Sequence, residues 1–268
     1  MAIAALNSAA TGLRSLSFKI DVIANNLANA ETNAFKGSRV NFEDLIYINQ
    51  RTPGARTISN EISPAGIQVG LGVRVSNTQL DLSQGAPQET GNPLDVAIAG
   101  DGFFRVQVME SAGGEAFTRN GNFFRNVDGD LVVGSRDGYR VLPAIQIPPN
   151  AQDITIAADG NITYRTPGQN LFANAGQLEL NRFVNPQGLE QIGGNLFRPS
   201  DASGPALSGP PAEGGAGEIR QNYLESSNVD PTKELVTLIK TQRSFELNSQ
   251  SIQTADQALQ TIANLRRG

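Results

Sequence analysis

Apolar residues recur at heptad spacing near the start of the chain. One row consists of Leu6, Leu13, Ile20 and Leu27, and a neighbouring row includes Leu16 and Ile23. Residues seven apart lie on the same face of a helix, so residues 1 to 30 are predicted to form one long amphipathic helix.

The same spacing returns at the other end of the chain. The apolar positions there are Leu238, Phe245, Ile252 and Leu259, with Ile262 in a flanking row. Asp230 suits an N-cap, and Pro231 suits the first helical position because its missing N–H has no partner there. Since a narrow apolar stripe stabilises little alone, we expect the two helices to pair as a coiled-coil-like stem.

Charged residues are sparse in the first predicted helix and in residues 247–265 of the second, where Asp256 is the only one. The only charged residues in residues 1 to 30 are Arg14, Lys19 and Asp21. Ala, Asn, Ser and Thr fill the other outer positions of this helix. An ordinary solvated surface is about 25–35% charged. This depletion favours a helical assembly in which neighbouring copies bury the outer faces, over an intramolecular coiled coil that ends there.

Between the helices, short β-type runs are separated by Gly, Pro, Asn and Asp. The sequence therefore predicts an α+β fold with an inserted, mainly β domain. Its expected parts are a discontinuous helical stem (residues 1–32 and 228–268), a connecting segment (33–76) and a β-rich domain (77–227). Residues 49–66 have no sustained period and are predicted to be a long loop or extended hairpin, which is either disordered or contacts another subunit.

Composition excludes several kinds of chemistry. The 268 residues contain no Cys and no His, which leaves no disulfide, no thiolate or imidazole zinc site and no Ser-His-Asp triad. The net charge of −5, from 21 Lys+Arg and 26 Asp+Glu, disfavours a nucleic-acid partner. No apolar run is long enough to span a bilayer, and the N-terminus does not resemble a cleavable secretory signal, because Asn7 and Ser8 interrupt its first apolar stretch.

Two motifs could suggest a ligand site. The spacing of Asn126, Asp128 and Asp130 resembles a calcium loop, but Leu131 stands where that loop needs Gly, so a hairpin turn is predicted. The Gly100–Gly102 segment lacks the third Gly of a dinucleotide loop. We therefore expect no catalytic residue, no cofactor and no metal.

Phe103 and Phe104 are adjacent in a predicted strand and should point to opposite faces. We expect one of them in the core and the other against a neighbouring molecule. Near the end of the first helix, the amides of Asn25, Asn26 and Asn29 are predicted either to cap terminal carbonyls or to bond to an adjacent subunit.

Residues 21–36 read DVIANNLANAETNAFK and closely resemble the N-terminal signature of the bacterial flagellar rod and hook family. The resemblance continues in short segments through nearly the whole chain, at residues 41–45, 95–98, 100–104, 116–121, 225–229 and 242–249. It implies a structural subunit, many copies of which stack into a rigid hollow rod, with the terminal helices innermost, that transmits motor torque to the hook.

The resemblance also implies roles for particular residues. It gives an intersubunit role to the signature residues Asn25, Asn26, Asn29, Thr32, Asn33, Phe35 and Lys36. Residues 49–66 look like the extra stretch that stiffens the distal type of rod by locking neighbouring subunits, and the residues concerned are Arg51, Pro53, Gly54, Pro64 and Gly66. A proximal rod or hook subunit is the alternative within the family.

The implied partners are further copies of the chain, proximal rod proteins, the hook protein, the surrounding L and P ring proteins and the flagellar type III export apparatus. The implied location is the basal body, from the periplasm to the outer membrane, reached without a cleaved signal peptide. From a different class of protein, a secreted oligomeric β-domain adhesin or binding module stays open as an alternative.

Overall fold

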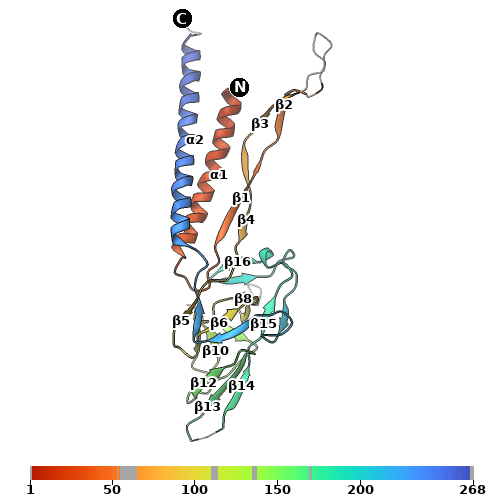
Figure 1. The fold of residues 1–268 in the computed structure, drawn as a ribbon, viewed down its shortest axis with the longest axis vertical. Helices are drawn as coiled ribbons and strands as arrows, with labels where there is room; N and C mark the ends of the chain where they lie inside the picture. Colours follow the sequence, from red (N-terminus) through yellow and green to blue (C-terminus); the bar gives the residue numbers. More distant parts are fainter. Residues whose placement is uncertain are drawn as a thin grey trace. The chain divides into compact units, whose positions relative to one another are not determined.

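The computed structural model describes residues 2–52, 54, 65–109, 114–134, 138–168 and 171–265. Across these residues the chain has a helix at each end and short strands between them, in agreement with the predicted α+β class (Figure 1). The chain divides into two compact units. The helical unit comprises residues 1–28, 38–80 and 230–268, and the β-rich unit comprises residues 29–37 and 81–229.

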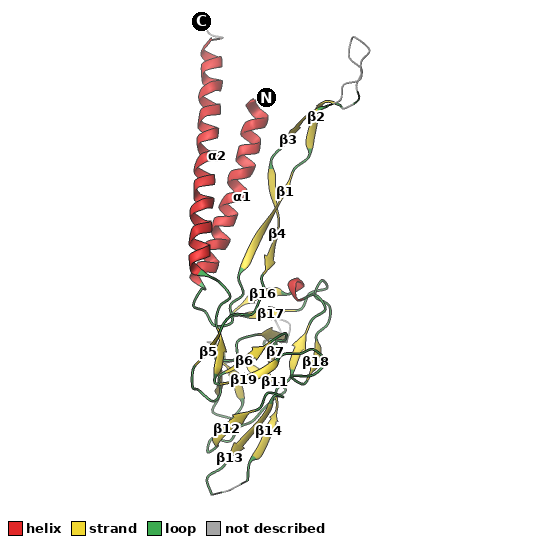
Figure 2. Cartoon of the chain, viewed as in Figure 1, coloured by secondary structure: helices red, strands yellow, loops and turns green. Residues whose placement is uncertain are grey.

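The helical unit contains the two helices, α1 (Ala2–Ala28) and α2 (Pro231–Leu265), which lie side by side (Figure 2). The predicted start of α2 is confirmed. The Asp230 carboxylate accepts hydrogen bonds from the backbone N–H groups of Thr232 (2.9 Å) and Lys233 (3.3 Å). These bonds, above all the one from Lys233, lower the pKa of Asp230. None of the described helices is apolar enough over a sufficient length to cross a membrane.

The heptad positions of α2 are among its less exposed ones, whereas α1 also buries Gly12, Ser15 and Asn26, which lie outside its heptad rows. In α1, Ile23 is buried, and the half-buried positions include Leu6, Leu13, Leu16, Ile20 and Leu27. In α2, Thr241 is buried, and the half-buried positions include Leu238, Phe245, Asn248, Ile252, Ala255 and Leu259. The side chain of Ile262 lies outside the described part of the chain. The period of 3.5 residues in α2 therefore matches its contact with a single neighbouring helix.

A hairpin covers a second face of α1 (Figure 1). Its strands β1 (Ser38–Asp44) and β4 (Val73–Leu80) are antiparallel, with a bulge between Asn41 and Phe42. The Thr11 hydroxyl oxygen accepts a hydrogen bond from the N–H of Val73 (3.3 Å). Gly72, at φ +119°, allows this close approach, because a Cβ there would lie 2.1 Å from Thr11 Oγ1.

The hairpin continues into a two-stranded ribbon formed by β2 (Tyr47–Arg51) and β3 (Ile67–Gly70). Every residue of β2 is exposed. The stretch predicted at 49–66 therefore begins as strand, whereas residues 53 and 55–64, with Pro53 and Pro64, lie outside the described residues. Of the other residues named in that stretch, Arg51 and Gly54 are exposed and Gly66 is half-buried.

The β-rich unit is built from antiparallel pairs. Its largest sheet has seven strands in the order β16 (Glu190–Gly193), β17 (Leu196–Arg198), β8 (Glu115–Thr118), β7 (Phe104–Gln107), β11 (Arg140–Leu142), β10 (Leu131–Val133) and β9 (Phe123–Arg125). A second sheet contains β12 (Gln152–Ile156), β13 (Asn161–Arg165) and β14 (Ala173–Gln177). The remaining pairs are β15 (Leu180–Arg182) with β18 (Leu207–Gly209), β6 (Val96–Ala99) with β19 (Glu218–Gln221), and β5 (Pro87–Glu89) with β20 (Tyr223–Glu225).

Phe103, which directly precedes β7, and Phe104, its first residue, are both buried, which corrects the expectation that one of them meets a neighbouring molecule. The Phe104 ring packs edge to face on Phe123, with centroids 5.0 Å apart. The Phe103 ring makes similar contacts with Phe183 (5.8 Å) and Phe197 (5.7 Å). The two rings do belong to different apolar clusters, as strand alternation predicts, but the chain itself covers both.

Candidate functional site

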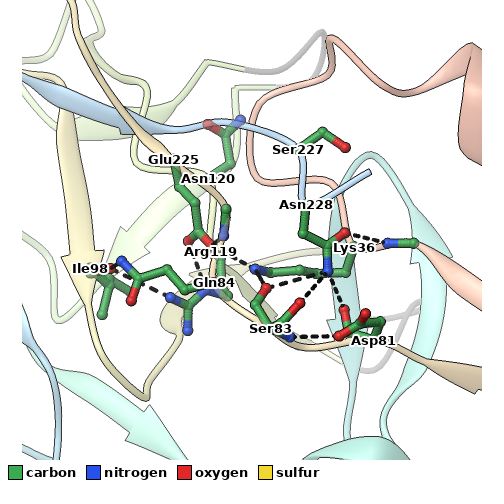
Figure 3. A network of polar contacts seen from close by, with 12 residues as sticks. Lys36, Asp81, Ser83, Gln84, Ile98, Arg119, Asn120, Glu225, Ser227 and Asn228 are labelled. Atoms are coloured by element: carbon green, nitrogen blue, oxygen red, sulfur yellow. Dashed lines mark hydrogen bonds and ion pairs between the residues drawn. The ribbon is translucent and has the colours of Figure 1, made fainter. Parts of the chain in front are cut away.

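A buried cluster of three charged side chains joins distant segments of the β-rich unit (Figure 3). Lys36 lies on the segment that follows α1 in sequence, Arg119 follows β8, and Glu225 is the last residue of β20. Their side chains are 0%, 4% and 1% exposed, respectively. Charged side chains are almost never so deeply buried unless they are paired, so this charge triad is a specific structural feature.

Glu225 occupies the centre of the charge triad. Its Oε1 atom is 2.5 Å from Lys36 Nζ, and its Oε2 atom is 2.8 Å from Arg119 Nε. The cations also donate to backbone carbonyls: Lys36 Nζ to Ser83 (2.6 Å), and the terminal nitrogens of Arg119 to Gly102 and Gly100 (3.1 Å each). These bonds meet the condition under which buried charges are tolerated, namely that they are paired and hydrogen-bonded.

Burial lowers the pKa of Lys36 below its ordinary value, because removing the ammonium from water disfavours the charged form. The neighbouring Glu225 carboxylate acts in the opposite direction and stabilises the ammonium. Arg119 lowers the Lys36 pKa further, since it brings a second positive charge to the same carboxylate. The triad therefore carries two positive charges and one negative charge when all three groups are ionised.

Further hydrogen bonds of the backbone and of the Asn228 side chain tie the same segments together. The carbonyl of Glu225 accepts from the N–H of Ala34 (2.7 Å). The Asn228 side chain accepts from the N–H of Gly37 (2.8 Å) and donates to the carbonyl of Asp81 (2.7 Å). The segment that leaves α1 in sequence and the segment that precedes α2 are thus fastened to each other within the β-rich unit.

The structure places the predicted signature residues in different settings. Lys36 belongs to the charge triad, and Asn26 is buried and exchanges two hydrogen bonds with the backbone of Ser38 (3.0 and 2.8 Å). The Thr32 hydroxyl donates to the side-chain oxygen of Asn29 (3.2 Å). Asn25 is exposed and Phe35 is half-buried. An open cleft of about 470 Å³ in the β-rich unit, the amide cleft, is lined by Asn29, Thr32, Asn33, Asn120, Asn122, Gly134, Gly194 and Asn195.

The predicted hairpin turn near residue 128 is confirmed. The side-chain oxygen of Asn126 accepts from the N–H of Asp130 (2.8 Å), and the N–H of Gly129 donates to the carbonyl of Asn126 (3.1 Å). The Asp130 carboxylate is bound by Arg140 (2.6 Å) and Gln146 (3.1 Å). Across the described ranges, no group of three or more His, Cys, Asp or Glu side chains is arranged to hold a metal ion.

Sequence reasoning missed Arg119 and Glu225 as functional residues. The signal available at Arg119 was the family resemblance at residues 116–121, and in the structure Arg119 directly follows the buried residues Ala116 to Thr118 of β8. A cation at that position is exceptional unless an anion faces it. The sequence offered no means of choosing Glu225 as that anion from among the 26 acidic residues.

Three segments of the chain match known protein families. Residues 6–36 match the flagella basal body rod protein family, residues 97–164 match the flagellar hook protein FlgE/F/G D1 domain, and residues 220–265 match the flagellar basal body rod FlgEFG protein C-terminal region. Each member of the charge triad lies in a different one of these segments.

Curated relatives are similar over almost the full chain. The flagellar basal-body rod protein FlgG of Buchnera aphidicola subsp. Baizongia pistaciae is 44% identical over 264 residues, covering 98% of this chain and 100% of the relative. FlgG of Caulobacter vibrioides is 43% identical, covering 98% and 99%. FlgG of Bacillus subtilis is 39% identical, covering 98% of each chain.

Proposed function

Because the chain belongs to the family of flagellar basal-body rod proteins and is a structural rod subunit of the flagellum, we propose that its copies stack helically into the distal rod. In this proposal the rod is a stiff hollow shaft that carries motor torque to the hook. The near full-length similarity to FlgG proteins supports the distal assignment.

We assign polymerisation to the helical unit, with α1 and α2 as a coiled-coil-like stem. The supporting observation is a set of exposed apolar residues on α2, Leu235, Val236, Ile239 and Leu247, which are 46–63% exposed. At 100° per residue these residues lie on the side of α2 away from its heptad rows. The ion pair of Arg243 and Glu246 (2.9 Å) lies on the same side between Ile239 and Leu247, so the exposed apolar surface consists of a patch at Leu235, Val236 and Ile239 and of the separate Leu247. An exposed apolar patch on a helix marks a face that another molecule covers.

The ribbon of β2 and β3 is proposed to contact a neighbouring copy and to stiffen the rod. The ribbon and the residue before it expose large apolar side chains: Ile46, Tyr47, Ile48 and Ile67 are 50–76% exposed. A two-stranded ribbon is marginally stable by itself, so cover from a neighbour would stabilise it. This proposal extends to Arg51, Pro53, Gly54, Pro64 and Gly66, the residues named for the stiffening stretch.

The charge triad is proposed to hold the β-rich unit rigid under torque. Pulling apart a buried ion pair exposes an uncompensated charge to a low-dielectric interior, which resists separation strongly. The wider setting is also proposed from the family: proximal rod, hook and L and P ring proteins as neighbours, and delivery by the flagellar export apparatus without signal cleavage.

Electron microscopy of the concentrated full-length chain tests polymerisation. We expect straight tubes of uniform diameter. Replacing Leu235, Ile239 and Leu247 by Gln should abolish the tubes while leaving the helical circular dichroism of the monomer unchanged, and Lys240→Gln on the same helix is the matched control. A fixed small oligomer, or tubes formed equally well by the triple variant, would contradict the proposal.

A further inference from the structure

The amide cleft is uncharged and polar. Five of its eight lining residues are asparagines, one is a threonine, and two are glycines. Its lining residues come from the segment 29–33, which follows α1 in sequence, and from segments next to β8, β9, β10 and β17. A cleft of this composition offers hydrogen bonds and neither a counter-charge nor a large apolar surface.

Several amide atoms in the cleft have no partner within the described residues. Asn195 donates through its side-chain nitrogen to the carbonyl of Asn33 (2.8 Å), which leaves its side-chain oxygen unpaired. Asn120 accepts from the N–H of Asn122 (3.1 Å), which leaves its side-chain nitrogen unpaired. The side chain of Asn33 makes no hydrogen bond to any described residue. The cleft therefore presents unused donors and acceptors together.

The cleft walls are held in place by other bonds. Asn195 has φ +59°, a conformation that Asn tolerates better than most residues, and its carbonyl accepts from the hydroxyl of Thr118 (2.8 Å). The side-chain nitrogen of Asn122 donates to Asp95 (3.1 Å). The free amide atoms consequently sit on a fixed frame, which reduces the entropy lost when a ligand binds.

The chemistry of the lining selects the kind of ligand. An amide side chain carries both a donor and an acceptor, which match the C=O and N–H groups of a peptide backbone. A charged ligand would be desolvated here without a counter-ion. A saccharide would find no aromatic ring for its apolar face among the lining residues. An extended main-chain segment satisfies the available groups best.

We propose that the amide cleft receives an extended main-chain segment of a second copy of this chain in the rod. This inference rests on the proposed function, since a rod of identical subunits holds the copies in contact. A second copy presents suitable groups: among the described residues β2 and β3 pair only with each other, so the outer edge of each carries unpaired backbone donors and acceptors. A contact between two different surfaces of the same chain generates an open helical filament when its rotation does not close into a ring.

The absence of cysteine from the sequence makes a direct test possible. Asn33→Cys provides a unique thiol for a photo-crosslinker in the cleft, and Asn150→Cys provides one on an exposed loop position of the same unit. In assembled tubes we expect the probe at position 33 to crosslink one copy to another, with mass spectrometry locating the second attachment in an extended segment. The probe at position 150 should crosslink copies far less.

A second test introduces a negative charge into the cleft with almost no change in side-chain shape. Asn33→Asp should leave the melting of the monomer unchanged, because this side chain has no internal partner, yet it should raise the protein concentration needed for tubes. Asn150→Asp is the control. Tubes from Asn33→Asp at the wild-type concentration, or no crosslink between copies at position 33, would overturn the inference and leave the rod function standing.

Two further outcomes separate the alternatives. Shifts of the Asn33 and Asn120 amide resonances on adding a neutral N-acetylglucosamine oligosaccharide to the monomer would overturn the inference in favour of a saccharide site. Failure of the wild-type chain to form tubes would overturn the proposed polymerisation, and this inference with it.

Discussion

Replacing Glu225 by Gln should destabilise the β-rich unit more than any other single change to the charge triad. Glu225 is 1% exposed and is the only anion between Lys36 and Arg119. Glutamine keeps the shape and one acceptor but leaves two buried cations facing each other. Removing one partner of a buried ion pair costs about 3–5 kcal/mol, and that is the loss expected in the free energy of unfolding of this unit.

Lys36→Met should cost less, although Lys36 is as deeply buried as Glu225. Its removal leaves a neutral Arg119–Glu225 pair, and both of its acceptors keep other donors: the N–H of Gly85 for Glu225 (2.9 Å) and Asn228 for the Ser83 carbonyl (3.3 Å). The expected loss is about 1–2 kcal/mol, the scale of one or two hydrogen bonds.

Hydrogen exchange followed by mass spectrometry measures the stability of the β-rich unit in both full-length variants, because peptides from β7 and β20 report on this unit alone. The matched control is Glu190→Gln, which removes an exposed ion pair with Arg198 and should cost less than about 1 kcal/mol. A loss for Lys36→Met as large as that for Glu225→Gln would refute the argument from net buried charge.

Four other outcomes are expected. Phe103→Ala and Phe104→Ala should each destabilise the β-rich unit by about 3–5 kcal/mol, because both rings are buried. Urea unfolding followed by near-ultraviolet circular dichroism measures this loss, and an effect of Phe103→Ala on assembly alone would contradict it. Gly72→Ala should lower the stability of the helical unit by about 1–3 kcal/mol in thermal melts at 222 nm, since its Cβ would meet α1. The pKa of Lys36 in the folded chain is lower than its ordinary value of 10.5. Between these two values the unfolded chain binds more protons than the folded chain, so the stability of the wild type should increase with pH relative to that of Lys36→Met. Nitrogen-15 titration of Nζ measures this pKa directly. The pKa of Asp230 is lowered in the folded chain, so its capping contribution is present near neutral pH and is lost as the pH falls through that pKa. Thermal melts of the helices at a series of pH values should show this loss for the wild type and not for Asp230→Ala.

Local signals in the sequence predict local structure well. The start of α2 follows from an N-cap residue before a proline, and the heptad rows identify which side of α2 is less exposed. The strand at Leu131–Val133 follows from a short apolar run with two β-branched valines after a turn signal. Each of these features depends on residues within a few positions of one another, where spacing and side-chain chemistry are sufficient.

Contacts between segments that are distant in the sequence could not be predicted in this way. The β6 strand pairs with β19, and Lys36 meets a carboxylate 189 positions away. Alternation along β7 correctly places Phe103 and Phe104 on opposite faces, but whether the chain covers both faces depends on Phe183 and Phe197 from other segments. Period and composition carry no information on which of many compatible strands becomes the neighbour.

The hairpin also changes what the low charge of α1 implies. The uncharged outer positions of the first helix are predicted to meet neighbouring copies, yet two of them contact the hairpin of the same chain: Ser8 donates to the carbonyl of Gly70 (3.3 Å) and Thr11 accepts from Val73. Lys19 lies over the ring of Phe42 at 5.9 Å. The chain itself therefore explains one uncharged face of α1, whereas the exposed leucines and isoleucine of α2 have no such cover among the described residues. The case for assembly through the helices accordingly rests on the outer side of α2, and substitutions there test it most directly.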